Sequence, residues 1–191
     1  MRKRHLVAGL LATLTQVCGG VAAQEPIDAV AYFERLEHTV GAGLARKTKV
    51  VDVRAAKVGE VIVTIIKGEG KETQSKPAVA GDRVVRNRCE ATGNEEILVA
   101  SETFTRRYEG PLGGPDAGGW SAYRPRGIEM KFIVVPAGDR EFSFIAPWGE
   151  RMIARPGDVL VQDPANARDT YRIQKAAFAC TYEIVRPAGG K

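Results

Sequence analysis

A pattern that occurs twice constrains this chain of 191 residues more than any other feature of its sequence. The earlier copy begins at Gly81-Asp82 and closes with Phe104-Thr105-Arg106-Arg107-Tyr108-Glu109. The later copy begins at Gly157-Asp158 and closes with Phe178-Ala179-Cys180-Thr181-Tyr182-Glu183. An internal repeat of this size indicates two units built on the same plan, although it says little about chemistry.

The segments around these landmarks are typical of short strands. Runs rich in Val, Ile and Thr alternate with Gly, Pro, Asn and Asp turns over residues 48–109 and again over residues 130–186. A short helix closes each copy, at residues 102–108 and 175–182. We therefore predict a mainly β (α+β) protein with two small repeated β modules. The alternative is one pseudo-twofold, intertwined small β-barrel.

Three further segments flank the two copies. Apolar residues recur at spacings of three and four over residues 26–40, which predicts an N-terminal amphipathic helix within the segment 24–47. Residues 45–49 are basic, and we interpret them as a solvated connector. Residues 110–129 are rich in Gly and Pro, which is typical of a linker, and residues 187–191 form a tail.

The repeated motif resembles a known type of module. Pro156-Gly157-Asp158-Val159-Leu160-Val161, the following Tyr171, and Phe178 to Glu183 are similar to the small "PGDYG" module of bacterial and phage proteins. The resemblance implies a compact, mainly β unit with one short helix, and it implies no catalytic residues. The sequence departs from the pattern at Val84 and Leu160, where the family has an aromatic residue.

The first 23 residues have the organisation of a secretory signal peptide. Arg2, Lys3 and Arg4 precede an apolar run over residues 6–14, and the small residues Val21-Ala22-Ala23 end the segment. The apolar run is shorter than the ~20 residues of a stable membrane anchor. We expect cleavage before Gln24 and a periplasmic or secreted protein with no integral membrane segment. The alternative is an uncleaved anchor.

Removal of the signal segment would change both the net charge of the chain and its number of cysteines. Removal of the three basic residues lowers the formal net charge from +5 to +2, so we expect no nucleic-acid partner, which would require a concentrated basic face. Cys18 leaves with the signal, while Cys89 and Cys180 remain. Two cysteines in an oxidising compartment predict one disulfide between them. The alternative is two thiols whose Cα atoms lie more than ~7 Å apart.

The residue types of common catalytic and metal sites are scarce in this chain. His38 is the one histidine that remains after cleavage, and together with two cysteines it makes no zinc set of usual spacing. The chain has no Gly-x-Ser-x-Gly elbow for a serine nucleophile. The sequence therefore predicts no metal site, no cofactor and no catalytic residue.

The repeated acids Asp82 and Asp158 have two interpretations. In the first they are structural: Gly81 and Gly157 supply a positive φ, and each aspartate accepts hydrogen bonds from neighbouring backbone N–H groups. In the second they are the paired carboxylates of a small exported hydrolase, which requires them to lie close together. We favour the structural interpretation because a residue that the fold needs occurs once in each copy.

One cluster has the composition of a recognition surface. Trp120, Tyr123, Arg124 and Arg126 lie together in the linker, and Trp, Tyr and Arg are the residues enriched at binding hot spots. The alternative is that Trp120 and Tyr123 fill the seam between the modules. We expect an exported, non-catalytic binding or assembly protein that takes an unknown protein or small ligand through this loop and the seam beside it.

Overall fold

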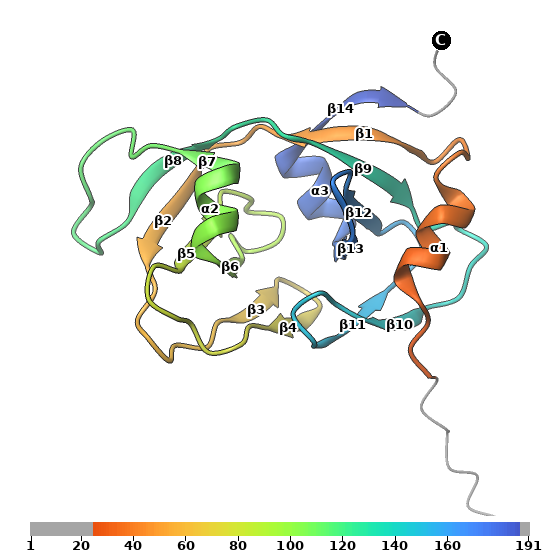
Figure 1. The fold of residues 1–191 in the computed structure, drawn as a ribbon, viewed down its shortest axis with the longest axis horizontal. Helices are drawn as coiled ribbons and strands as arrows, with labels where there is room; N and C mark the ends of the chain where they lie inside the picture. The colour runs from red at the N-terminus through yellow and green to blue at the C-terminus, as the bar shows by residue number, and fades with distance from the viewer. Residues whose placement is uncertain (1–24, 188–191) are drawn as a thin grey trace, which may run out of the picture.

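The computed structural model describes residues 25–187, so the predicted signal segment 1–23 and nearly all of the tail lie outside the described residues. Within this range the chain is mainly β, with fourteen strands and three short helices. The prediction of a mainly β (α+β) protein is therefore confirmed. Most strands belong to two five-stranded sheets, and the others form two separate hairpins (Figure 1).

The first sheet is built around the earlier copy of the predicted repeat. Its spatial order is β6 (Glu96–Val99), β5 (Arg83–Asn87), β2 (Val51–Ala55), β8 (Ser121–Pro125) and β7 (Tyr108–Glu109). The helix α2 (Ser101–Arg107) runs directly into β7 and buries Phe104 against the valines of β2 and β5. Apolar residues at alternate positions of these strands thus form one small core on the helix side of the sheet.

The second sheet has the same arrangement around the later copy. Its spatial order is β13 (Asn166–Ile173), β12 (Val159–Asp163), β9 (Glu129–Val134), β1 (Ala42–Lys47) and β14 (Tyr182–Pro187). The helix α3 (Lys175–Thr181) runs directly into β14 and buries Phe178 against Phe132, with ring centroids 5.3 Å apart. Each sheet therefore has a helix that closes it at the same place.

Two strands each belong to one five-stranded sheet, while the strand that follows each of them in the chain belongs to the other. β1 precedes β2 in the chain, yet β1 pairs with β9 and β14 of the second sheet. β8 precedes β9, yet β8 pairs with β2 and β7 of the first sheet. Residues 42–47, predicted as part of the helix and connector segment, and residues 121–125, predicted as linker, are thus strands, and each pairs with another strand on both sides.

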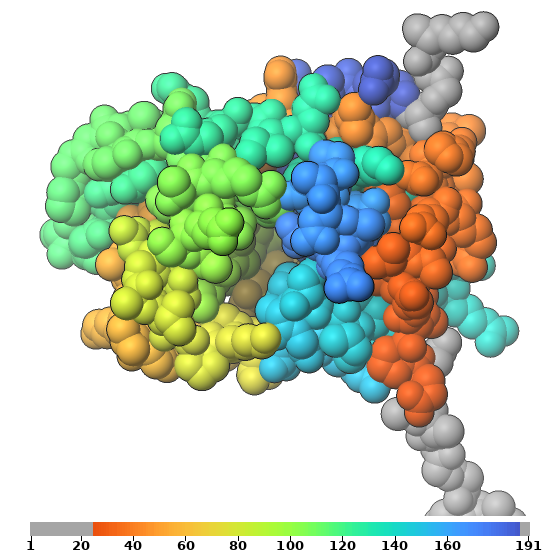
Figure 2. All heavy atoms as spheres, in the orientation of Figure 1, coloured from red at the N-terminus to blue at the C-terminus, as the bar shows by residue number. Residues whose placement is uncertain are grey.

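The alternative of a single closed barrel is wrong for the described part of the chain, where each sheet remains open. The two hairpins lie side by side along the lower edge of Figure 1: β3 (Val63–Ile66) with β4 (Gly70–Gln74), and β10 (Phe142–Ile145) with β11 (Arg151–Ala154). The two hairpins lie opposite the two sheets and cover the space between the sheets at the lower edge of this view. Figure 2 shows a hollow on this face, between the yellow and green segments of the first half and the blue ones of the second.

The N-terminal helix α1 (Ala29–Leu36) is shorter than the predicted 26–40. Asp28 caps it by accepting hydrogen bonds from the backbone N–H groups of Val30 and Ala31. The helix buries Phe33 against the second sheet and the β10–β11 hairpin. Gly43, which resembles a helix stop in the sequence, lies instead in β1, where an added Cβ would be 2.2 Å from the carbonyl oxygen of Arg186.

Candidate functional site

The two repeated aspartates lie in equivalent turns. Asp82 accepts hydrogen bonds from the backbone N–H groups of Val79 (3.0 Å) and Ser101 (3.1 Å), and Asp158 accepts them from Arg155 (2.9 Å) and Lys175 (3.2 Å). Both carboxylates therefore tie a turn to the start of the helix that follows. Gly81 and Gly157 have φ values of 95° and 88°, which a residue with a side chain rarely adopts.

The four residues of the predicted recognition loop are held by neighbours of the first sheet. The Trp120 ring lies under the guanidinium groups of Arg86, at 3.9 Å, and Arg54, at 5.2 Å. Tyr123 packs edge-on against Phe104 of the small core. Arg124 and Arg126 both pair with Glu109. Trp120 and Arg124 thus lie on the outer part of this sheet, and Tyr123 belongs to its interior.

The two cysteines lie near each other although they come from different halves. Both are thiols in the structure: Cys89 is buried and Cys180 is partly exposed at the end of α3. Burial raises the pKa of Cys89, but hydrogen bonds from Cys180 and Thr92 outweigh this effect and leave it below its usual value. Burial and the Cys89 thiol raise the pKa of Cys180, while Lys49, at 3.5 Å, lowers it.

A cavity in the described part of the chain lies at the seam between the two sheets. Its volume is about 340 Å³. It is lined by β3, β4, β6 and α2 from the first half and by β9, β11, β13 and α3 from the second. Trp120, Tyr123, Arg124 and Arg126 do not line it. The apolar part of its wall includes Ile66, Ile97, Leu98, Met130, Trp148 and Met152.

Glu72 enters this cavity because the β3–β4 hairpin contains a β-bulge. Thr64 pairs with Thr73 and Ile65 pairs with Lys71, so Glu72 is the extra residue of β4 with no partner on β3. Bulges redirect side chains and are common next to functional sites. Both Glu72 and its neighbour Thr73 line the cavity as a result.

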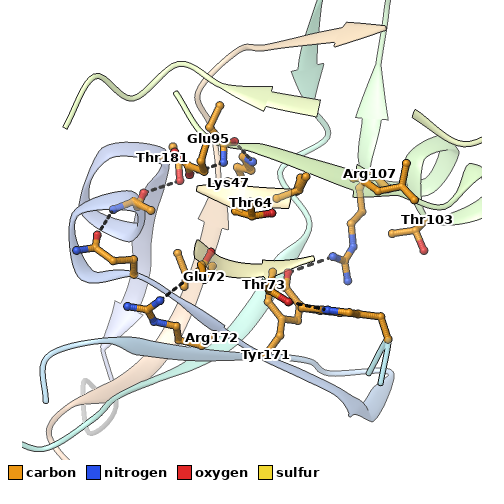
Figure 3. Close-up of a pocket in the computed structure, with 18 of the residues that line it drawn as sticks. Lys47, Thr64, Glu72, Thr73, Glu95, Thr103, Arg107, Tyr171, Arg172 and Thr181 are labelled. Atoms are coloured by element: carbon orange, nitrogen blue, oxygen red, sulfur yellow. Dashed lines mark hydrogen bonds and ion pairs between the residues drawn. The ribbon is translucent and has the colours of Figure 1, made fainter. Parts of the chain in front are cut away.

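Arg172 meets Glu72 from the opposite wall. Its Nη1 donates to Glu72 Oε1 at 2.6 Å, its Nη2 to Glu69 Oε2 at 3.0 Å, and its Nε to Asp158 Oδ2 at 2.9 Å. The Arg172 side chain is only 2% exposed, so this network is buried. Figure 3 shows the Arg172 and Glu72 side chains extending toward each other from β13 and β4.

The protonation of Glu72 is set mainly by its burial. Burial raises the pKa of Glu72 from 4.5 to about 7, and repulsion from Glu95 and Glu69 acts in the same direction. The attraction and the hydrogen bond of Arg172 oppose this rise without cancelling it. A carboxyl that titrates near neutral pH in a cavity is one of the properties that mark functional sites.

A second polar group of the cavity is organised around the Asn87 amide. Asn87 Oδ1 accepts a hydrogen bond from Lys47 Nζ at 2.5 Å, and Asn87 Nδ2 donates to Glu95 Oε1 at 2.7 Å. Thr92 donates its hydroxyl to the other Glu95 oxygen. The Lys47 ammonium, predicted to be part of a solvated connector, therefore faces the cavity and is linked to a buried carboxylate through one amide.

The third polar group contains Arg107 and two tyrosines. Arg107 pairs with Asp169 at 2.7 Å and donates to the Tyr171 hydroxyl at 3.2 Å. Figure 3 shows Arg107 and Tyr171 on the same side of the cavity. The buried Nε of Arg107 has no hydrogen-bond partner among the described residues. Tyr171 also bonds with Tyr182, and burial raises the pKa of both phenols. The tyrosines therefore remain neutral and act as hydrogen-bonding groups.

The sequence interpretation missed these cavity residues. Glu72 lies in a short polar stretch and gives no motif, and Lys47 is one of several basic residues in a row. The one available signal was a difference between the copies: Arg172 stands where the first copy has Leu98. A charged residue at a strand position that is apolar in the other copy indicates a special environment.

Comparison with protein-family models, with curated proteins and with solved structures found no match for this chain. The resemblance to the PGDYG module therefore stays a prediction. None of the helices in the described residues is long and apolar enough to cross a membrane. Within those residues no group of three or more His, Cys, Asp or Glu side chains is placed to hold a metal ion.

Proposed function

We propose that this protein is an exported, non-catalytic binding protein whose ligand is a small molecule held in the seam cavity. The cavity carries the proposal, because about 340 Å³ lies in the size range of small-molecule sites, which combine an apolar wall with a few convergent polar groups. Arg107 Nε and Glu72 Oε2 have no hydrogen-bond partner within residues 25–187. A buried polar atom such as Arg107 Nε is usually satisfied by a protein group or another molecule.

Binding of N-phenyl-1-naphthylamine tests the proposal, because the emission of this neutral dye rises in an apolar site. The purified mature protein should bind the dye with a saturable increase in emission. Ala177 lines the cavity and is 4% exposed, so Ala177→Phe should fill part of the space and weaken binding at least tenfold. Ala179 is exposed on the same helix, so Ala179→Phe serves as the matched control.

Two results would overturn this proposal. The first is a dye signal that does not saturate, and the second is equal binding by the Ala177→Phe and Ala179→Phe proteins. If Ala177→Phe does not fold, Thr103→Trp replaces it, since Thr103 also lines the cavity and projects from α2, with Thr105→Trp on the exposed side of α2 as its control.

A hydrolase that uses carboxylates is the second candidate, and one observation favours it. Glu72, with a pKa of about 7, is suited to exchange a proton at neutral pH, and Glu95 lies in the same cavity. Asp82 and Asp158 are not the acids that this candidate would use, because backbone N–H groups hold both. A screen of aryl glycosides and aryl esters from pH 5 to 8 tests it: an activity that Glu72→Gln abolishes would establish the hydrolase.

We also propose that residues 1–23 are removed on export. The support is the small-residue site Val21-Ala22-Ala23 after the apolar run. The intact mass of exported protein should correspond to a chain that begins at Gln24. A mass that retains residues 1–23 would contradict both the cleavage and the assignment to the periplasm or the medium.

A further inference from the structure

The carboxylates around Glu72 outnumber the cations that face them. Arg172 contacts Asp158, Glu69 and Glu72, and Arg155 contacts Glu69 and Glu141. Four carboxylates therefore share two guanidinium groups. Asp158 is held by backbone N–H groups, and Glu69 also accepts from Gln174 at 2.8 Å. Glu72 is the carboxylate of this network that lines the cavity.

One oxygen of Glu72 is available to a ligand. Oε1 receives the Arg172 hydrogen bond, whereas Oε2 accepts no hydrogen bond from any of residues 25–187. The β-bulge directs this side chain inward, and its 11% exposure places it at the wall of the cavity. A carboxylate that shares its one cation with two other acids gains more from a new cation than a fully paired carboxylate would.

Aromatic rings form part of the same wall. Trp148 is held by a hydrogen bond from Nε1 to Thr73 Oγ1, the neighbour of Glu72, at 3.1 Å. The Trp148 and Tyr171 ring centroids lie 6.2 Å apart, and Tyr108 and Tyr182 also line the cavity. The faces of such rings attract cations, and a carboxylate beside aromatic rings is an arrangement that recognises amines and ammonium ions.

The cations of the cavity already contact carboxylates or are linked to them, although Arg107 Nε itself has no hydrogen-bond partner among the described residues. Arg107 pairs with Asp163 and Asp169. Lys47 is linked through Asn87 to Glu95, a buried carboxylate with no cation within 4.0 Å among the described residues. The negative charge of the Glu95 carboxylate therefore offsets the positive charge of the Lys47 ammonium group at this end of the cavity. An anionic ligand would meet these carboxylates as well as the cations.

We propose that the ligand of the seam cavity is an organic cation, an amine or ammonium ion on an apolar or aromatic body, with its charged nitrogen against Glu72 and its body against Trp148 and the apolar wall. This inference rests on the proposed binding function and specifies its ligand class. The aromatic and apolar residues account for affinity to the body, and Glu72 accounts for selection of the charge.

Three probes with one aromatic skeleton test the charge selection: 1-naphthylmethylamine, 1-naphthylmethanol and 1-naphthoate. Each is titrated at pH 8 against the mature protein loaded with N-phenyl-1-naphthylamine, and displacement of the dye gives the affinity. The amine should bind at least about tenfold more tightly than the alcohol, as expected for one charge-assisted hydrogen bond. The naphthoate should bind most weakly.

The variant Glu72→Gln assigns the selection to this residue. It keeps an acceptor for Arg172, and it should lose the preference for the amine over the alcohol, with both affinities measured relative to the affinity of the same variant for the dye. Glu90→Gln removes the same charge from an exposed position and should keep the preference. The amine preference of the unmodified protein should also fall about tenfold or more between pH 8 and pH 5, as Glu72 gains a proton in competition with the ligand.

The possible outcomes separate this inference from the function on which it rests. Failure of the dye to bind would overturn the cavity as a binding site. Dye binding with equal affinities for amine and alcohol would overturn the cation proposal alone, and so would a preference for naphthoate that Lys47→Met removes. If Glu72→Gln does not fold, a flat pH profile of the amine preference would overturn the role of Glu72.

Discussion

Glu72 and Arg172, a hundred positions apart in the chain, join the two halves of the molecule through a hydrogen bond of 2.6 Å across the seam cavity. The hairpin that carries Glu72 is also tied to the second half by Glu69, which pairs with Arg155 and Arg172. The same polar network thus holds the cavity wall in place and presents a carboxyl group to the interior. The consequences for stability can be measured separately from binding.

Glu72→Gln should stabilise the protein at pH 8 and have little effect at pH 5. Because the pKa of Glu72 in the folded protein, about 7, lies above its ordinary value of 4.5, the folded state holds this proton more tightly than the unfolded state. The contribution of protonated Glu72 to the free energy of unfolding is complete below about pH 4.5, falls as the pH rises above that value, and is lost above about pH 7. The loss is at most ~3 kcal/mol. Urea unfolding at both pH values measures it, and equal gains at pH 5 and 8 would contradict the shifted pKa.

Arg172→Met should destabilise the protein by about 3–5 kcal/mol at pH 7, because it leaves buried carboxylates without their cation. Arg155→Met is the matched control: Arg155 also pairs with Glu69, but its side chain is 45% exposed, so its loss should cost under about 1 kcal/mol. Denaturant unfolding of both variants measures the two losses of stability. Similar losses would show that the buried network is not the main link between the halves.

Cys89 and Cys180 should form one disulfide in protein recovered from an oxidising compartment, since the two thiols lie near each other on the two sides of the seam. A bond that closes so long a loop would stabilise the fold by up to ~4–5 kcal/mol in the chain-entropy model, and by less if it is strained. Thiol titration of the denatured, non-reduced protein should find no free thiol. Two free thiols per chain, together with an unchanged melting temperature after reduction, would rule the bond out.

The double change Trp120→Ala, Arg124→Ala should leave dye binding in the cavity unchanged, because neither residue lines it. We expect the free energy of unfolding to fall by about 1–2 kcal/mol, because the variant loses the stacking of Trp120 on Arg86 and Arg54. If the loop is a separate surface for a protein partner, cross-linking recovery of that partner should fall while the fold persists. A double variant that unfolds would assign the loop residues to the core.

The local features of the fold could be predicted from the sequence because short-range rules govern them. Val- and Ile-rich runs between turn residues indicated the strands that flank the turns, and Gly81 and Gly157 indicated positive φ values. The short helices α2 and α3 were predicted at the segments that contain the aromatic pairs Phe104/Tyr108 and Phe178/Tyr182. These rules depend on neighbours within a few positions, so one sequence contains the information that they need.

The exchange of strands and the cavity were decided only by the tertiary structure. β1 and β8 are strands because each pairs on both sides with strands that lie far away in the sequence or across a long loop, and their own basic or Gly-rich surroundings gave no such indication. Glu72 titrates near neutral pH because folding buries it opposite Arg172, beside Glu69 and Glu95. Burial, bulge geometry and charges that come from distant positions in the chain set these properties, and sequence spacing does not encode them.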